Sequence, residues 1–321
     1  MNKNCGFGIN ARASFLAAVL AAFIAGCGSG DGGQIFGSDS GGPGISGSPG
    51  PAGSAPALGA AGAFAGLSGG SAGMTNDGTL TVITGAQGQP VSIGTTGAST
   101  LVTGFHDTSV AYVPPPGQSG CTYTETTSNI GRVDGTINTD APPPDPIACP
   151  NEGTAATKAL ADAGAAAALA AYNDLAARPG GIDLGNGELG GRTLAPGVYK
   201  SAPGTYNISL GDLTLDAGGN PNAVWVFQLA TALTVGIAGP TGARSVILIG
   251  GAQPKNVFWQ VGSAATINGA GGGTMVGTII ATQGVTFSTT GNLGITTLNG
   301  RALSLVASVT MTNTHINVPA P

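Results

Sequence analysis

Residues 222–316 repeat one short pattern four times. Each copy has an apolar stretch, a corner of small residues, and a threonine between two apolar residues. With a shorter copy at Thr214, the threonines Thr214, Thr234, Thr266, Thr286 and Thr310 recur after 20, 32, 20 and 24 residues. Such intervals are too long for hairpins and match one turn of a solenoid. The sequence therefore predicts stacked coils of β-structure.

The residues beside each threonine predict which way its side chain points. Neighbouring side chains of a strand face opposite sides, so the apolar neighbours would fill a parallel β-helix and the threonines would face outward. Successive rungs would lie ~4.8 Å apart, and outward neighbours along one strand ~6.7 Å apart. The inward pairs would be Leu233 and Val235, Ala265 and Ile267, Val285 and Phe287, and Val309 and Met311. The outward neighbours would be Ala232, Gly236, Ala264, Asn268, Gly284, Ser288, Ser308 and Thr312.

None of those outward neighbours is charged, and none is large. Threonine is β-branched and fills the solvent-facing positions of many strands without binding anything, so ordinary strand filling is one interpretation of the pattern. A solvated face normally carries lysine and glutamate, however. The absence of charge favours a second interpretation, in which the threonines form a flat, stiff binding surface of methyl and hydroxyl groups.

The composition fits this architecture and narrows the range of partners. The chain has 321 residues, of which 58 are glycine and only 8% are charged. Glycine suits tight corners between strands because it adopts left-handed backbone angles without strain. The formal net charge of −5 provides no basic patch, so we do not expect nucleic acid as a partner.

Residues 1–26 have the features of an export signal. Lys3 and Arg12 supply positive charge, and the apolar core over residues 13–24 is too short to span a bilayer. Residues 24–27, Ile-Ala-Gly-Cys, resemble the bacterial lipobox, which implies cleavage before Cys27 and lipidation of that residue. Gly28 in place of aspartate favours, by the same analogy, an exported protein that is lipid-anchored at the outer membrane or cell surface. The alternative is a secretion signal with a chance cysteine.

A tether and a folded domain follow the signal. Residues 27–57 are rich in Gly, Pro and Ser and lack the apolar residues of a core, so they predict a flexible tether. Residues 58–321 would form the β-helix domain. Within it, residues 106–150 interrupt the regular pattern with two triproline runs. We interpret them as an inserted cap, because the open end of a solenoid would otherwise template other chains.

Cys121 and Cys149 both lie in that insertion. In an exported domain they are expected to be oxidised. A disulfide between them would close a loop of about 29 residues and stabilise the fold by roughly 3 kcal/mol. A zinc site is the alternative, although neither cysteine has a Cys or His partner at the usual spacing.

Residues 154–177 predict a single long helix, because alanine and leucine dominate and proline is absent. Leu160, Ala163, Ala167 and Ala171 fall at helical spacing, with Leu169 and Tyr172 nearby. Arg178-Pro-Gly-Gly would end the helix. We expect small residues to dock it along a sheet face, since Lys158, Asp162 and Asp174 argue against a membrane span.

Longer motifs lie in and before the repeats. They are Leu-Ala-Pro-Gly-Val-Tyr at residues 194–199, residues 212–224, residues 256–266, and Leu-Asn-Gly-Arg-Ala-Leu at residues 298–303. Together they resemble the ice-binding protein family of bacteria and fungi over about residues 58–318. The resemblance implies an all-β fold, an irregular right-handed parallel β-helix of roughly triangular section with one long α-helix packed alongside.

The resemblance also implies ice binding through a flat face of Thr, Ser, Ala and Asn side chains. By position this face matches the strands with a central threonine, so we expect an ice surface as partner, beside the membrane that holds the lipid. The expected ice-binding residues are Thr234, Thr266, Thr286, Ser288, Ser308, Thr310 and Thr312, with Ser71, Thr79 and Thr81 extending the patch. Asp212 and Asp216 would flank Thr214 at one edge of the face, where charge suits ice poorly.

Two other classes of function are open at this point. A structural or adhesive surface module without ice activity would have the same sequence features. An enzyme is the other class, because polysaccharide lyases also use β-helices. Nearby acids in the sequence are Asp183, Glu188, Asp212 and Asp216, and residues 216–220 hint at a calcium turn without its repeated period. Since His106 and His315 stand alone, we expect no enzyme, cofactor, metal or small-molecule substrate.

Overall fold

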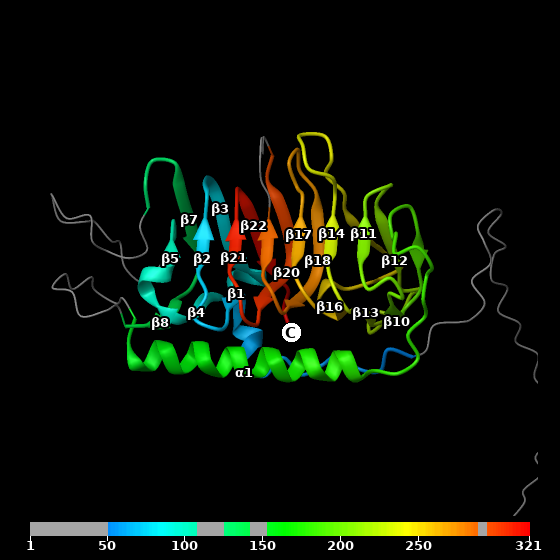
Figure 1. The fold of residues 1–321 in the computed structure, drawn as a ribbon, viewed down its shortest axis with the longest axis horizontal. Helices are drawn as coiled ribbons and strands as arrows, with labels where there is room; N and C mark the ends of the chain where they lie inside the picture. Colours follow the sequence, from blue (N-terminus) through cyan, green and yellow to red (C-terminus); the bar gives the residue numbers. More distant parts are fainter. Residues whose placement is uncertain (1–50, 108–124, 142–152, 288–293) are drawn as a thin grey trace, which may run out of the picture. The chain divides into compact units, whose positions relative to one another are not determined.

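A computed structural model describes residues 51–107, 125–141, 153–287 and 294–321. All of them belong to one compact unit that runs from Ile45 to Pro321. Its strands wind into stacked coils, and the ladders between them are parallel (Figure 1). The predicted β-helix is therefore confirmed. The strands lie on three sides of the stack, which we call the threonine wall, the helix wall and the third wall.

The threonine wall is a seven-stranded sheet of short strands. In spatial order these are β11 (Tyr206–Ile208), β14 (Leu233–Val235), β17 (Ala265–Ile267), β19 (Val285–Phe287), β21 (Val309–Met311), β2 (Met74–Asn76) and β5 (Val102–Thr103). Every predicted inward pair is buried, because the two apolar residues of each triplet point into the coil.

The helix wall lies under the single α-helix. Its strands are β10 (Gly197–Lys200), β13 (Trp225–Leu229), β16 (Val257–Val261), the ends of β18 (Thr274–Ala281) and β20 (Thr296–Ser304), β1 (Phe64–Ser68), β4 (Ser92–Ala98) and β8 (Ile137–Asp140). The third wall holds β9 (Thr193–Leu194), β12 (Leu213–Asp216), β15 (Val246–Ile249), the beginnings of β18 and β20, β22 (Thr314–Val318), β3 (Gly78–Gly85), β7 (Asn129–Val133) and β6 (His106–Asp107). Short 3-10 helices are η1 (Gly59–Ala63), η2 (Ala86–Gly88), η3 (Ser99–Leu101) and η4 (Pro254–Asn256).

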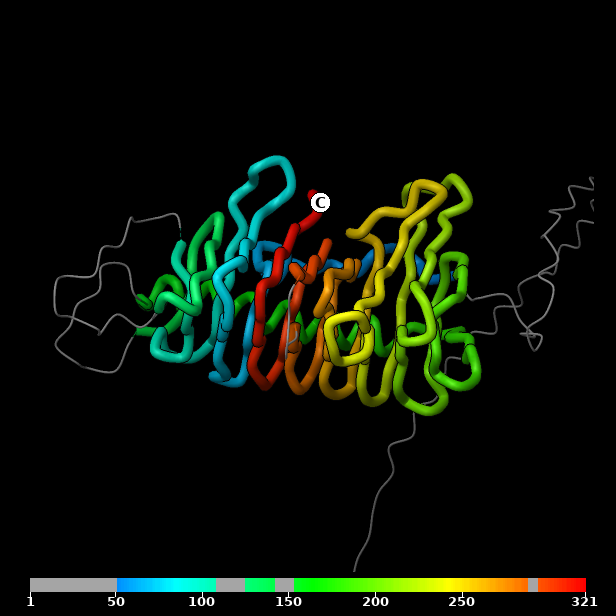
Figure 2. Tube along the Cα trace, turned by 90° about the horizontal axis from the view of Figure 1, so that it is seen from above, coloured from blue at the N-terminus to red at the C-terminus, as the bar shows by residue number. Residues whose placement is uncertain are grey.

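The coils do not stack in the order of the chain. The first coil pairs with the last one: β1 lies against β20, β2 against β21 and β3 against β22. Figure 2 shows the red C-terminal coil beside the blue and cyan N-terminal coils. The helix α1 (Ala155–Ala177) then carries the chain along the stack to its other end, where β10 and β11 begin (Figure 1). The N-terminal and C-terminal halves thus form one continuous prism.

The helix α1 docks through its small side chains, as expected, but on a different face. Thr154 caps the helix, since its hydroxyl accepts a hydrogen bond from the Thr157 backbone N–H at 3.1 Å. Its buried residues are Ala161, Gly164, Ala168, Ala171 and Leu175. Of the four residues predicted at helical spacing only Ala171 is buried, and Leu160 is 56% exposed. Close packing is the reason: a Cβ at Gly164 would lie 2.7 Å from a ring carbon of Phe64. Among the described helices, none is long and apolar enough to cross a membrane.

Aromatic rings stack through the interior on consecutive coils. Tyr199, Phe227 and Trp259 are register partners on β10, β13 and β16. The ring centroids of Tyr199 and Phe227 are 5.4 Å apart, and those of Phe227 and Trp259 are 4.0 Å apart at an interplanar angle of 9°. Such pairs contribute about 0.5–1.5 kcal/mol each beyond burial. They make this end of the prism stiff.

The described part of the predicted insertion adds strands to one end of the stack. The strand β7 pairs with both β3 and β6, and β8 pairs with β4. Cys121 and Cys149 lie outside the described residues, as do Cys27 and the segment before residue 51, so the disulfide, the tether and the lipid anchor stay predictions.

Candidate functional site

One row of side chains runs along the centre of the threonine wall. The middle residues of its strands are register partners from coil to coil: Asn207, Thr234, Thr266, Thr286, Thr310, Thr75 and Thr103. Each is partly exposed, whereas the strand residues beside them are buried. We call this the central row. Parallel rungs repeat every ~4.8 Å, so the row is a nearly straight line of six threonines and one asparagine.

Except on the last coil, where Leu101 precedes Thr103, the positions beside the central row are small or polar. Two residues before each central residue the chain has Thr205, Ala232, Ala264, Gly284, Ser308, Gly73 and Leu101. Two residues after it, the described positions on the first six coils are Ser209, Gly236, Asn268, Thr312 and Asp77. Asp77 is the one charged residue in these two sets, and it lies past the end of β2. The wall is therefore uncharged along its strands.

Glycine is required at two of these flanking positions. Gly284 has φ +118°, and a Cβ there would lie 2.8 Å from the Ser308 carbonyl oxygen. Gly236 has φ +72°, and its Cβ would lie 2.4 Å from the Asn268 carbonyl oxygen. Because the backbones of adjacent coils approach so closely there, larger residues cannot stand beside Thr286 and Thr234 without shifting the coils. The flatness of the wall follows from the backbone itself.

The structure brings most of the predicted site residues together. Thr234, Thr266, Thr286 and Thr310 lie in the central row. Ser308 and Thr312 flank Thr310 before and after its strand, and the Ser308 hydroxyl accepts a hydrogen bond from the Gly73 N–H at 3.2 Å. Ser288 lies outside the described residues.

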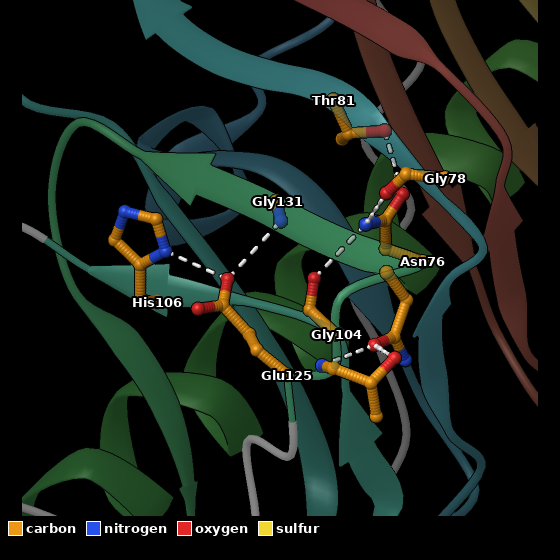
Figure 3. Close-up of polar contacts among 9 residues, drawn as sticks. Asn76, Gly78, Thr81, Gly104, His106, Glu125 and Gly131 are labelled. Atoms are coloured by element: carbon orange, nitrogen blue, oxygen red, sulfur yellow. Dashed lines mark hydrogen bonds and ion pairs between the residues drawn. The ribbon is translucent and has the colours of Figure 1, made fainter. Parts of the chain in front are cut away.

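Three residues predicted to extend the patch lie elsewhere. Thr79 and Thr81 belong to β3 on the third wall, because the chain turns at Gly78, which has φ +132°. Thr81 is 2% exposed, and its hydroxyl donates to Asn76 Oδ1 at 2.6 Å (Figure 3). The same hydroxyl accepts from the Thr314 N–H at 3.1 Å. Ser71 stands at the corner before β2 with φ +57°, outside the strands of the wall. Their assignment to the face was wrong.

Sequence reasoning missed three members of the central row. Thr75 lies between Met74 and Asn76, and Thr103 follows Val102, so the same local signal of an apolar residue next to threonine marks both. Asn207 lies between the buried residues Tyr206 and Ile208. Aligning every apolar-polar-apolar triplet, with asparagine accepted at the centre, would have found Asn207. The other two occur in the N-terminal coils, whose place in the stack is not visible from local sequence.

The two aspartates that were expected at the edge of the ice-binding face, Asp212 and Asp216, do not lie on the threonine wall. Asp212 immediately precedes β12 and Asp216 ends it, and β12 lies on the third wall, where Thr214 pairs with Ile247 rather than with a threonine of the central row. Asp216 Oδ1 accepts from the Gly218 N–H at 2.9 Å, and Asp212 Oδ1 accepts from the Ser245 N–H at 2.8 Å. Both carboxylates thus hold turns of the third wall, because an aspartate beside a turn can accept from a nearby backbone N–H.

The other acids are engaged in the same way. Glu188 accepts hydrogen bonds at Oε1 from the Gly190 and Ser209 N–H groups, at 2.7 and 2.9 Å, and at Oε2 from the Ser209 hydroxyl at 2.5 Å. Burial alone would raise the pKa of Glu188, but these hydrogen bonds stabilise its charged form, and the pKa is lowered overall. Asp183 accepts from the Gly185 and Ala202 N–H groups.

His106 has a partner, contrary to expectation. Its Nδ1 lies 2.7 Å from Glu125 Oε1, which also accepts from the Gly131 N–H at 3.2 Å (Figure 3). These residues stand at the end of the stack, on β6 and beside β7, and not on the threonine wall. Within the ranges that the structure describes, no three His, Cys, Asp or Glu side chains gather closely enough to hold a metal ion.

The amino-acid sequence is similar to those of known proteins. The profile of the Ice-binding-like family matches residues 69–317. An ice-binding protein of a Colwellia species is 40% identical over 154 residues, which cover 46% of this chain and 53% of the relative. An ice-binding protein of a Nostoc species is 38% identical over 46% of this chain and 49% of the relative, so the chain spans about half the length of these two relatives. An ice-binding protein of a Leucosporidium species is 32% identical over 70% of this chain and 72% of the relative.

Solved structures share the fold. The crystal structure of an ice-binding protein from an Antarctic biological consortium has a TM-score of 0.56 at 29% identity, covering 82% of this chain and 91% of that one. An ice-binding protein from an Arctic yeast has a TM-score of 0.58 at 28% identity, covering 83% and 96% of the two chains.

Proposed function

Because the chain belongs to the Ice-binding-like family, we propose that its threonine wall adsorbs to ice. The observation that carries this proposal is the central row, in which seven side chains of similar size stand in register and none is charged. A charged group is strongly hydrated in water. It would have to give up this hydration shell at an ice surface, which costs free energy. Threonine instead offers a methyl group and a hydroxyl at a fixed spacing.

The stiffness of the wall supports adsorption through many weak contacts. The five inner residues of the central row each lie between two backbone ladders, and buried neighbours such as Leu233 and Val235 flank Thr234. A β-branched side chain also has few rotamers to lose. Adsorption therefore orders almost nothing in the protein, so small contributions from successive rungs add without a large entropic cost.

The proposed function is non-catalytic, and the protein would carry it out at the cell surface. The acids described above are occupied by backbone N–H groups, which leaves them poorly suited to act as general acids or bases. Cys27, in the predicted lipobox, would carry a lipid anchor, and an exported, anchored chain would present the threonine wall outside the cell. Holding cells at ice or keeping crystals off the envelope are both compatible with that placement.

Ice adsorption and its site are tested by one set of variants. Thermal hysteresis and inhibition of recrystallisation are measured for the wild-type chain, for Thr266→Tyr with Thr286→Tyr, and for Thr214→Tyr as a matched control on the third wall. We expect activity in the wild type, a several-fold loss of activity in the double variant, and no loss of activity in the Thr214→Tyr control. A purely structural or adhesive module would show no activity in any of the three. Equal losses in the double variant and the control would refute the assignment of the wall.

A further inference from the structure

A cavity of about 700 Å³ lies where the third wall turns into the helix wall. It is lined by six residues between Ser54 and Gly62, by the segments at the start of β13 and β16, by Arg301 of β20, and by Pro319–Pro321. This volume is within the range of sites that take small molecules. The threonine wall forms the remaining side of the prism, so a molecule in this cavity would leave the central row uncovered.

Arg301 is the unusual residue of this cavity. It is only 6% exposed, and its Nε and Nη2 both donate to the Gly62 carbonyl oxygen, at 3.2 and 3.0 Å. It forms no ion pair with any described residue, and burial lowers its pKa. A buried positive charge that lacks a counter-charge is costly unless something else compensates for it. One neutral carbonyl oxygen is a weak compensation for a guanidinium.

A second cation lines the same cavity. Lys255 lies in η4, and its Nζ donates one hydrogen bond to a carboxylate oxygen of Pro321 at 2.6 Å, which leaves further N–H donors on the ammonium group. Among the described residues that line the cavity none is an aspartate or glutamate. Arg301 and Lys255 outnumber the Pro321 carboxylate, so the lining keeps a net positive charge, with donors of the kind that bind phosphate or carboxylate oxygens.

The rest of the lining is apolar. Its larger members are Pro56, Leu58, Val224, Phe258 and Pro319. A bare inorganic ion would fill only a small part of this volume and would gain nothing from these side chains. A molecule with an anionic head and an aliphatic tail would use both, because its head would meet the cations and its tail would remove apolar surface from water.

We propose that this cavity binds an amphiphilic anion, namely a phosphate or carboxylate group attached to an aliphatic chain. Arg301, which is buried in β20, and Lys255, which lies in η4, hold the anionic head. Leu58 and Val224 contact the aliphatic tail. The site is separate from the threonine wall and does not depend on ice binding. The anion can be a free amphiphile or the head of a membrane lipid.

The test is calorimetric titration of the full chain with hexyl phosphate, inorganic phosphate and hexanol. We expect hexyl phosphate to bind at one site, and the other two probes to bind at least about tenfold more weakly, since each lacks one half of the interaction. Lys255→Glu should lower the affinity for hexyl phosphate by about tenfold or more. Lys200→Glu, an equal change of charge on an exposed lysine of β10, should leave that affinity within about twofold of the wild-type value. Arg301→Gln, checked for folding by its melting curve, should abolish binding.

Absence of hexyl phosphate binding, equal binding of hexanol, or an unchanged affinity in Lys255→Glu would each overturn the proposal. Sedimentation with phosphatidic acid vesicles separates the two sources of the anion. Binding to vesicles that Lys255→Glu removes and hexyl phosphate competes away assigns the site to lipid; binding of hexyl phosphate alone assigns it to a free amphiphile. Thermal hysteresis of Lys255→Glu should equal that of the wild type, so the failure of either proposal leaves the other standing.

Discussion

Glu188 is paired with Asn207 by a parallel backbone bridge, which puts a carboxylate next in line after the last uncharged residue of the central row. The bridge extends the row by one position at the end where β11 is the outermost strand. The carboxylate does not lie free on the surface, because Ser209 and Gly190 donate to it. The uncharged row therefore ends at Asn207 because a structural acid occupies the next rung.

Glu188→Thr should lengthen the proposed ice-binding surface by one rung of ~4.8 Å. The charge next to Asn207 would disappear, and a methyl and a hydroxyl group would take its place. We expect a modest rise in thermal hysteresis, together with a lower Tm, by about 2–4 °C, because the Gly190 and Ser209 N–H groups lose their acceptor. Hysteresis is compared at equal concentrations of folded protein, with Asp183→Thr as the control on a nearby turn. A fall in hysteresis with full folding would contradict this role for the end of the row.

The same residue predicts a dependence of stability on pH. The pKa of Glu188 is lowered from its ordinary value of 4.5 in the folded protein. Its ionised form therefore contributes stability that is present above the unfolded pKa and is lost as the pH falls through the folded pKa. Glu188→Gln should lower the Tm near neutral pH, and the difference from the wild type should shrink as the pH falls below about 4. Melting curves from pH 7 to pH 3 measure this difference; one that stays constant would show that the hydrogen bonds do not favour the charged form.

Thr75→Tyr and Thr79→Tyr distinguish the two walls that these residues occupy. Thr75 is the register partner of Thr310 and Thr103, whereas Thr79 lies beyond the turn at Gly78. A tyrosine in the central row would project past its neighbours and hold a flat surface away from them. We expect a several-fold loss of thermal hysteresis for Thr75→Tyr and wild-type activity for Thr79→Tyr. The reverse result would mean that the active face lies on the third wall.

Much of this arrangement could be predicted from local sequence, for a physical reason. A strand turns alternate side chains to opposite sides, so Leu233-Thr234-Val235 on its own states which residue faces outward. The order of the coils could not be predicted in this way. Gly66 pairs with Ala302 on a strand more than 200 residues away, and nothing in either segment marks the other as its partner. Thr75 and Thr103 join the central row only through that pairing.

The sequence did not predict which face of α1 docks on the helix wall, and the reason is different. Alanine occupies nearly every turn of the helix on both sides, so hydrophobic periodicity hardly distinguishes one face from another. Gly164 marks the docked face, since a Cβ there would lie only 2.7 Å from Phe64 and 3.0 Å from Leu67. The wall beneath the helix, and not the helix sequence, selects the buried stripe of Ala161, Gly164, Ala168, Ala171 and Leu175.

Gly164→Leu should therefore destabilise the protein much more than the same change one residue earlier. A Cβ at Gly164 already lies 2.7 Å from Phe64 and 3.0 Å from Leu67, so a leucine there would force the helix away from the wall at a cost of about 1–3 kcal/mol. Ala163 is exposed, and leucine is a good helix former, so Ala163→Leu should change stability by no more than about 0.5 kcal/mol. Urea denaturation of the two variants measures the contrast. Since α1 packs on the helix wall, thermal hysteresis per folded molecule should be unchanged in both; a loss in Gly164→Leu alone would mean that helix docking sets the register of the threonine wall.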